Sequence, residues 1–177
     1  MNPYTKTEIL ETMQSHVATF TAYLEQLSPE QFFSGTPEKW GAALQVQHLS
    51  QTLGMIAKGF GVPERLPPAP ETKARSFSEI RSSYNQALGG GVVLSGNFLP
   101  TLEAQTSTEY QQAVISTFQN TVTAFSSALT TWEDAQLDTL GMKHPLMGLL
   151  PAREMAIFAV YHNTHHEAGI KKFLGGN

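Results

Sequence analysis

The sequence predicts an all-α fold, an antiparallel four-helix bundle with short extra helices and one long crossover connection. Apolar residues recur at steps of three and four in four long stretches, and helix-start signals precede several of them. No stretch alternates apolar and polar residues for long enough to indicate a sheet. The 177 residues have the size of one domain, so we expect a single bundle over residues 1–177.

The first long helix is predicted to start after Thr5, because Thr5 and Glu8 have the spacing of a capping box. Apolar residues then recur at helical spacing as far as Leu27. A short connector helix is expected next. Ser28 followed by proline is a start signal, and the glycine and prolines up to residue 37 stop the helix early.

The second long helix is predicted over residues 41–60, where apolar side chains form one stripe. Four prolines in residues 61–75 cannot continue a helix, so we expect an extended surface loop there. A modest helix from Ser76 to about Leu88 then leads into a glycine-rich crossover over residues 89–100.

The third long helix is predicted from Thr106, which forms a second capping box with Glu109, to Trp132. Residues 134–150 contain two glycines and one proline, and we expect them to be a plain connection. Pro151 then opens the last long helix, which ends before the final glycines.

The composition excludes several classes of protein and site. Charged residues make up 15% of the chain and the net charge is -4, so no basic face is available for nucleic acid. The absence of cysteine excludes disulfides, thiolate ligands and a cysteine nucleophile, so any metal must be held by nitrogen and oxygen. The start of the chain lacks the regions of a signal peptide, and no apolar run approaches the ~20 residues of a membrane span. We therefore expect a cytoplasmic protein.

The segment Tyr161–His166 holds three of the six histidines within five residues. His162 and His166 are four residues apart, so on a helix they can point two imidazoles at one ion, and His48 is the natural third ligand. Three neutral nitrogens leave a divalent metal with open positions, which is typical of a catalytic site. The alternative is that all three are structural histidines bonded to carbonyls or water. The other two histidines carry no spacing argument and are expected to be exposed or locally bonded: His16 and His144.

His165 lies about 100° from His166 on a helical wheel and is expected at the edge of the site. There it would act in catalysis by shuttling a proton near neutral pH, with Glu167 orienting it. Each metal ligand also needs an acceptor for its second ring nitrogen. Glu167, Gln45 and Gln47 are candidates for this role, and the sequence does not choose among them.

Three segments resemble, in order, motifs of the DinB-like superfamily, whose members are four-helix bundles regarded as metalloenzymes. Lys39–Leu49 resembles the tryptophan, turn and histidine-leucine at the start of the second helix. His144–Gly148 resembles the lead-in to the last helix, and Tyr161–Ile170 resembles the closing histidine pair, with the doubled histidine of one branch.

The resemblance implies a metal triad of His48, His162 and His166 that holds nickel, zinc or iron. It also implies thiol-dependent S-transfer or action on thiol conjugates, and a homodimer. Two features depart from the family pattern. Ala168 and Gly169 stand where many members have glutamine, and the segments 61–75 and 89–100 look peculiar to this chain or its branch.

The leading functional hypothesis is a metal-dependent enzyme acting on a small molecule, as a thiol-dependent S-transferase or a hydrolase. Since the chain has no cysteine, any thiol must come from the substrate. One alternative is a non-catalytic bundle with a structural metal or none, acting in dimerisation. Another is a bundle that binds a small apolar ligand among its phenylalanines and methionines.

Overall fold

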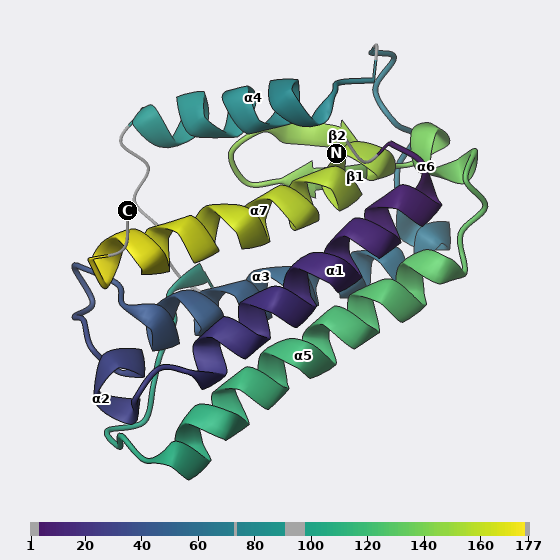
Figure 1. The fold of residues 1–177 in the computed structure, drawn as a ribbon. Helices are drawn as coiled ribbons and strands as arrows, with labels where there is room; N and C mark the ends of the chain where they lie inside the picture. The colour runs from purple at the N-terminus through teal and green to yellow at the C-terminus, as the bar shows by residue number, and fades with distance from the viewer. Residues whose placement is uncertain (1–3, 73, 91–97, 176–177) are drawn as a thin grey trace.

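Four long helices form the frame of the molecule, which the computed structural model describes over residues 4–72, 74–90 and 98–175. They are α1 (Lys6–Glu25), α3 (Ala42–Phe60), α5 (Thr108–Thr130) and α7 (Ala152–Phe173). Helix α1 contacts α5 and α7, and α3 contacts the same two helices (Figure 1). The described chain is mostly helical, as the sequence predicted.

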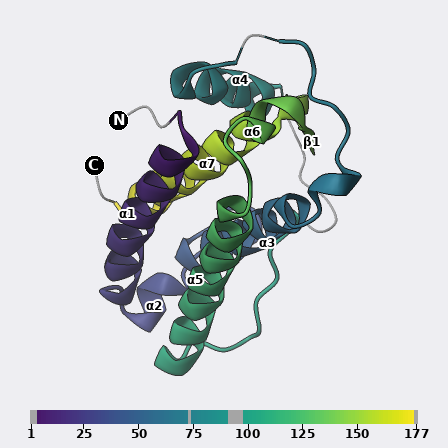
Figure 2. The ribbon, with the colours of Figure 1, turned by 90° about the vertical axis from the view of Figure 1, so that its right-hand side faces the viewer.

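Shorter helices cover the ends and one side of this frame. They are α2 (Pro29–Phe32), the 3-10 helix η1 (Pro63–Arg65), α4 (Phe77–Gly89) and α6 (Gln136–Thr139). Helix α4 packs against α7, and in Figure 2 α7 lies between α4 and the other long helices. Helix α7 therefore has protein on both of these sides.

The capping signals place most helix starts correctly. Thr5, Ser28 and Ser76 each accept a hydrogen bond from the backbone N–H three residues on, and each forms a complete capping box. In helix α5 the N-cap lies one residue later than predicted. Its cap is Ser107, which accepts from the N–H of Tyr110, and not Thr106 as the sequence predicted.

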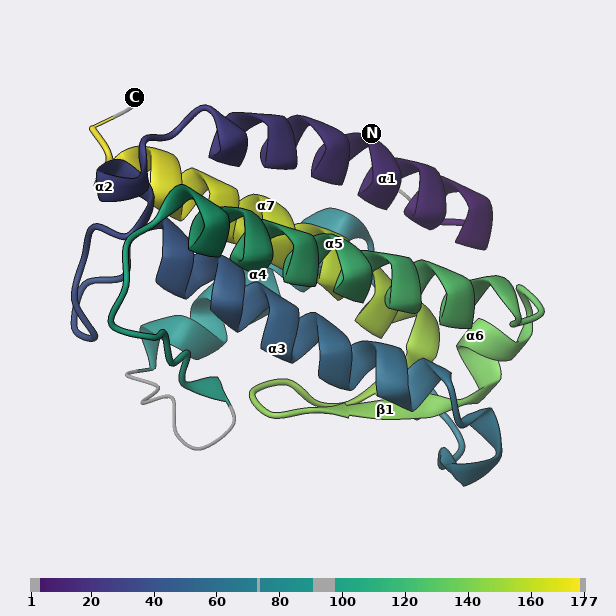
Figure 3. The same ribbon diagram turned by 90° about the horizontal axis from the view of Figure 1, so that it is seen from below.

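A β-hairpin occupies part of the segment that was expected to be a plain connection. Strands β1 (Gly141–His144) and β2 (Gly148–Pro151) pair antiparallel, and the hairpin extends below α3 in Figure 3. Each strand has only four residues without regular alternation, which is why the periodicity did not reveal them. Gly148 closes the turn at φ 77°, a left-handed conformation that suits glycine.

The proline-rich loop after α3 forms backbone hydrogen bonds with the base of this hairpin. The N–H of Ala69 donates to the carbonyl of Thr139 at 2.9 Å, and the N–H of Gly141 donates to the carbonyl of Pro67 at 2.8 Å. The loop begins with η1 and is otherwise irregular, in keeping with the prediction for residues 61–75. In the predicted crossover over 89–100, residues 91–97 lie outside the described part of the chain.

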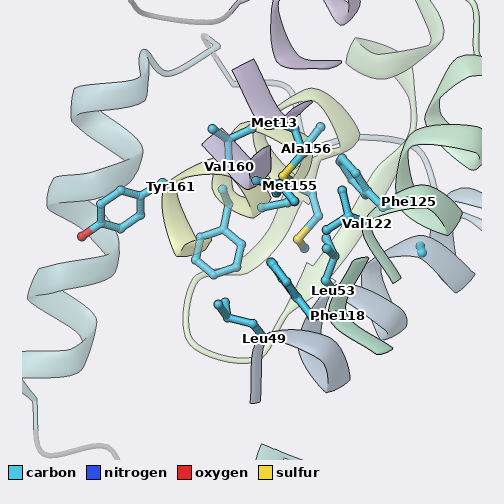
Figure 4. Packing of buried hydrophobic residues seen from close by; sticks show 14 of the residues in the cluster. Met13, Leu49, Leu53, Phe118, Val122, Phe125, Met155, Ala156, Val160 and Tyr161 are labelled. Carbon is cyan, nitrogen blue, oxygen red and sulfur yellow. The ribbon is translucent and has the colours of Figure 1, made fainter. Parts of the chain in front are cut away.

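Apolar side chains from all four long helices meet in one core (Figure 4). The predicted stripes supply it, with Met13 from α1, Leu49 and Leu53 from α3, and Phe118 and Phe125 from α5. All five are no more than 2% exposed. Among the described residues, no helix is both long and apolar enough to cross a membrane.

Helix α7 is enclosed on all sides over its first half. Every residue from Ala152 to Asn163 is buried, and the helix contacts α1, α3, α4, α6 and both strands. A buried charge needs a partner. Arg153 finds two, because its guanidinium donates to the carboxylates of Asp134 and Asp138 at 3.0 and 2.7 Å. These contacts hold the segment before the hairpin against the start of α7.

Replacing Arg75 by alanine should destabilise the fold strongly. The Glu154 side chain is 1% exposed, and Arg75 donates to its carboxylate from Nη2 at 2.7 Å and from the backbone N–H at 2.8 Å. Removing the guanidinium leaves a buried carboxylate short of donors, so urea unfolding should show a loss of about 3–5 kcal/mol.

The matched control is Arg65→Ala, because Arg65 and Glu64 form an ion pair with both side chains more than two-thirds exposed. Such a pair contributes ~1 kcal/mol at most, so this variant should unfold almost like the wild type. Equal losses in the two variants would show that the pair of Arg75 and Glu154 is not a stabilising contact.

Candidate metal centre

Three buried histidines from two helices meet at the interface of α3 and α7. His48 lies on α3, and His162 and His166 lie one turn apart on α7. One ring nitrogen from each lies within 4.8 Å of the others. Their residues are 3%, 4% and 9% exposed. The structure thus brings together the three residues that the spacing and the resemblance selected.

The outward nitrogens of two of these rings are bonded to oxygens that can only accept. The Nδ1 of His48 donates to the carbonyl of Phe98 at 2.8 Å, and the Nδ1 of His166 donates to the Oε1 of Gln45 at 3.0 Å. The amide nitrogen of Gln45 donates to the Trp40 carbonyl at 3.0 Å, which assigns the amide oxygen to His166. Gln45 is therefore the acceptor among the three candidates that the sequence left open.

The third ring, His162, faces a hydroxyl. Its Nδ1 lies 3.5 Å from the Oγ1 of Thr52. The Thr52 hydroxyl donates its own proton to the carbonyl of His48 at 2.9 Å, so its oxygen is left to accept from His162. All three imidazoles are then protonated on Nδ1 and carry a lone pair on Nε2.

These tautomers leave two lone pairs facing each other. The Nε2 atoms of His162 and His166 lie 3.1 Å apart. A hydrogen bond between them would require a proton on one Nε2, and the Nδ1 of that ring would then lose the donor role that its oxygen partner favours. A cation at the inner nitrogens removes this conflict. The donor set of three neutral imidazole nitrogens therefore fits a divalent metal ion.

Protonation of a histidine could supply positive charge in place of a metal ion, but burial disfavours the protonated form. Loss of hydration lowers the pKa of His162 and of His166 well below the ordinary value, and the neighbouring histidines lower both further. Burial also lowers the pKa of His48. The three rings are therefore neutral near pH 7, which is the state in which imidazole binds a metal.

His165 and Glu167 lie in different surroundings. His165 is half-buried beside α4, with its Nδ1 3.4 Å from the Tyr161 hydroxyl and its ring 5.2 Å from that of His166. Glu167 instead contacts Lys171 at 2.6 Å and the His16 ring of α1 at 3.5 Å. Residues two apart on a helix do not face each other, so the expectation that Glu167 orients His165 is corrected.

A cavity of about 280 Å³ lies beside the three histidines. His48, Thr52 and His162 form part of its wall. Most of the remaining wall is apolar and comes from α3, α7, the β-hairpin and the segment before α5: Met55, Ile56, Phe98, Met142, Pro145, Leu146, Met155 and Phe158. Sequence reasoning missed this wall, because no signal revealed the hairpin that supplies three of these apolar residues.

His144 and Tyr84 are further polar residues of the cavity wall. The Nδ1 of His144 accepts from the backbone N–H groups of Leu146 and Met147, both at 3.1 Å, so the prediction of a locally bonded histidine is confirmed. Burial, and to a lesser degree the charge of Arg75, lowers the pKa of His144 to about 4. Burial raises the pKa of Tyr84 to about 12. Both groups are thus neutral at pH 7.

Comparisons of this chain with protein-family models, with curated proteins and with solved structures found no match. The resemblance to the DinB-like superfamily therefore stands on the motifs of the sequence alone.

Gly169→Ala should weaken metal binding without touching a ligand. A Cβ at Gly169 would lie 2.7 Å from the Oε1 of Gln45, so the flexible amide must move away from His166. Loss of such a supporting hydrogen bond lowers metal affinity by about 10- to 100-fold. Competition for zinc against a chromogenic chelator measures the change.

Gly54→Ala is the control, because a Cβ there meets only the Thr121 methyl group at an ordinary 3.7 Å. It should bind zinc as the wild type does. An unchanged zinc affinity in Gly169→Ala would mean that Gln45 does not support His166.

The metal-free protein should lose stability in acid, partly through His144. Its pKa falls from 6.5 unfolded to about 4 folded, so below pH 6.5 the unfolded chain binds a proton that the folded chain refuses. The free energy of unfolding should thus fall from pH 6.5 to 4, with about 3 kcal/mol from this group at most.

His144→Asn isolates this contribution, since asparagine can still accept from the turn but does not titrate. Urea unfolding at pH 7, 6, 5 and 4 should give a shallower decline for the variant. Parallel curves for variant and wild type would contradict the assignment.

Proposed function

We propose that the chain is a four-helix bundle of the DinB-like kind, in which His48, His162 and His166 hold a divalent metal ion for catalysis on a small molecule. The observation that carries the proposal is that one ring nitrogen of each histidine lies within 4.8 Å of the others, while the Nδ1 of every ring faces an oxygen. Imidazole ligands suit nickel, zinc or iron. Each of these metals is compatible with the site.

The number of ligands favours a catalytic over a structural ion. Structural zinc sites are closed by four protein ligands, whereas catalytic sites use three and leave a position for water or substrate. Among the residues that the structure describes, the group contains three histidines and no carboxylate. Two of the three also line the adjacent cavity, so a substrate in the cavity would lie next to the ion.

The residues of the chain have separate roles in this proposal. His48, His162 and His166 hold the ion, and Gln45 and Thr52 orient two of the rings. A bound ion would supply Lewis acidity and lower the pKa of a coordinated water or thiol. The apolar wall excludes water, and His165 is the proposed proton carrier. S-transfer with an external thiol and hydrolysis are the two reaction classes that this arrangement supports.

Elemental analysis of protein purified without an affinity tag or added metal tests the proposal. Wild type should contain about one nickel, zinc or iron per chain. His48→Ala and His162→Ala should lose the metal and keep their helical circular dichroism, whereas His16→Ala, outside the group, should keep both.

Each other outcome favours a different hypothesis. Loss of folding together with the metal in His162→Ala would indicate a structural ion. A wild type that stays metal-free after reconstitution would show that the three-histidine site is wrong and favour a binding or dimerisation role. Sedimentation of the same samples would test the expected homodimer.

A further inference from the structure

Two hydrogen-bond donors in the cavity wall have no partner for their protons among the described residues. They belong to His144, at the end of strand β1, and to Tyr84, on helix α4. Both residues are more than nine-tenths buried, yet neither donor is among the polar atoms that the protein shuts off from solvent. A ligand in the cavity can therefore reach both donors.

The hairpin turn fixes the proton of His144. Its Nδ1 accepts from two backbone N–H groups at 3.1 Å, so the ring proton is on Nε2. The residue is 5% exposed, and its ring packs edge-on against Phe158 at 4.4 Å. Because the Nδ1 side faces the turn, the Nε2–H is directed away from the turn, toward the cavity that the ring lines.

Tyr84 lies near both His144 and the three-histidine group. Its ring centre is 5.9 Å from that of His144 and 5.8 Å from that of His162, and the residue is 7% exposed. Over residues 4–72, 74–90 and 98–175, its hydroxyl forms no hydrogen bond to protein. The phenol can therefore donate to a ligand that also reaches His144.

We infer that the cavity binds a monocarboxylate with an apolar tail, whose carboxylate accepts hydrogen bonds from the Nε2 of His144 and the hydroxyl of Tyr84. The methionine, isoleucine, leucine and phenylalanine side chains of the wall suit the tail. At roughly 30 Å³ per water molecule, the cavity has the volume of about nine waters, enough for a short chain or one ring.

The preference for an anion over a neutral carbonyl compound rests on the proposed metal centre. A divalent ion held by three neutral histidines keeps its full charge, since no carboxylate in the described chain joins the group. Lys143, an exposed residue of strand β1 that is part of the cavity wall, adds positive charge nearby. The two donors select for an oxygen, and the positive charge selects for a carboxylate.

Calorimetric titration of the zinc-loaded full chain with octanoate tests the inference. Octan-1-ol has the same tail without the carboxylate, and acetate has the carboxylate without the tail. Wild type should bind octanoate at least 10-fold more tightly than either. His144→Asn keeps the acceptor for the turn and removes the Nε2–H, and Tyr84→Phe removes only the hydroxyl. Each should weaken octanoate binding by about 10- to 100-fold, the range for a hydrogen bond to a charged group.

Tyr161→Phe is the matched control, because the Tyr161 hydroxyl is already satisfied by Asn85 at 2.8 Å and its residue does not line the cavity. This variant should bind octanoate as wild type does. The inference is overturned if wild type does not bind octanoate, or if His144→Asn and Tyr84→Phe bind it as tightly as the control.

Zinc content, measured on the same samples, separates this inference from the proposed function. A chain that binds zinc but shows no dependence on His144 and Tyr84 refutes the ligand class and leaves the metal centre standing. A chain that binds no zinc refutes the metal centre. Octanoate titration of that metal-free chain still tests the cavity. Octanoate binding that is lost in both His144→Asn and Tyr84→Phe supports the inference, and absence of octanoate binding to the wild type overturns it.

Discussion

The enclosure of helix α7 is the constraint on which the rest of the structure depends. The buried charged side chains and imidazoles of this helix have little access to water, so they take partners from other segments. In the first turn of α7, Arg153 pairs with Asp134, and Glu154 pairs with Arg75 of the proline-rich loop. The histidines further along use α3. These contacts set the register of α7 against its neighbours and, with it, the direction of the imidazoles.

The features that could be predicted from the sequence depend on the spacing of residues within one continuous segment. The long helices follow from apolar periodicity, and His162 with His166 follows from a separation of one turn. The choice of His48 needed the resemblance as well. The acceptor for His48 could not be predicted, because it is the backbone carbonyl of Phe98, which any residue could supply. Glu167 was misplaced because its partners, His16 and Lys171, depend on how α1 packs on α7.

The interior around the histidines is polar but uncharged. Burial keeps the imidazoles and the Tyr84 phenol in their neutral forms, and the buried carboxylate of Glu154 on the same helix pairs with Arg75. In a low-dielectric interior, an uncompensated positive charge interacts strongly with whatever lies beside it. The site is thus arranged so that a bound ion, and not the protein, would be the dominant charge.

The two halves of the site belong to parts of the chain with different tolerance for change. The three histidines come from the middle of long packed helices, where an inserted residue would rotate the following side chains by about 100°. Much of the opposite wall comes from a hairpin of four-residue strands, whose turn residues between His144 and Gly148 belong to no packed helix. Relatives could therefore diverge in turn length and sequence, and so in the molecules they accept, while the arrangement of the histidines stays fixed.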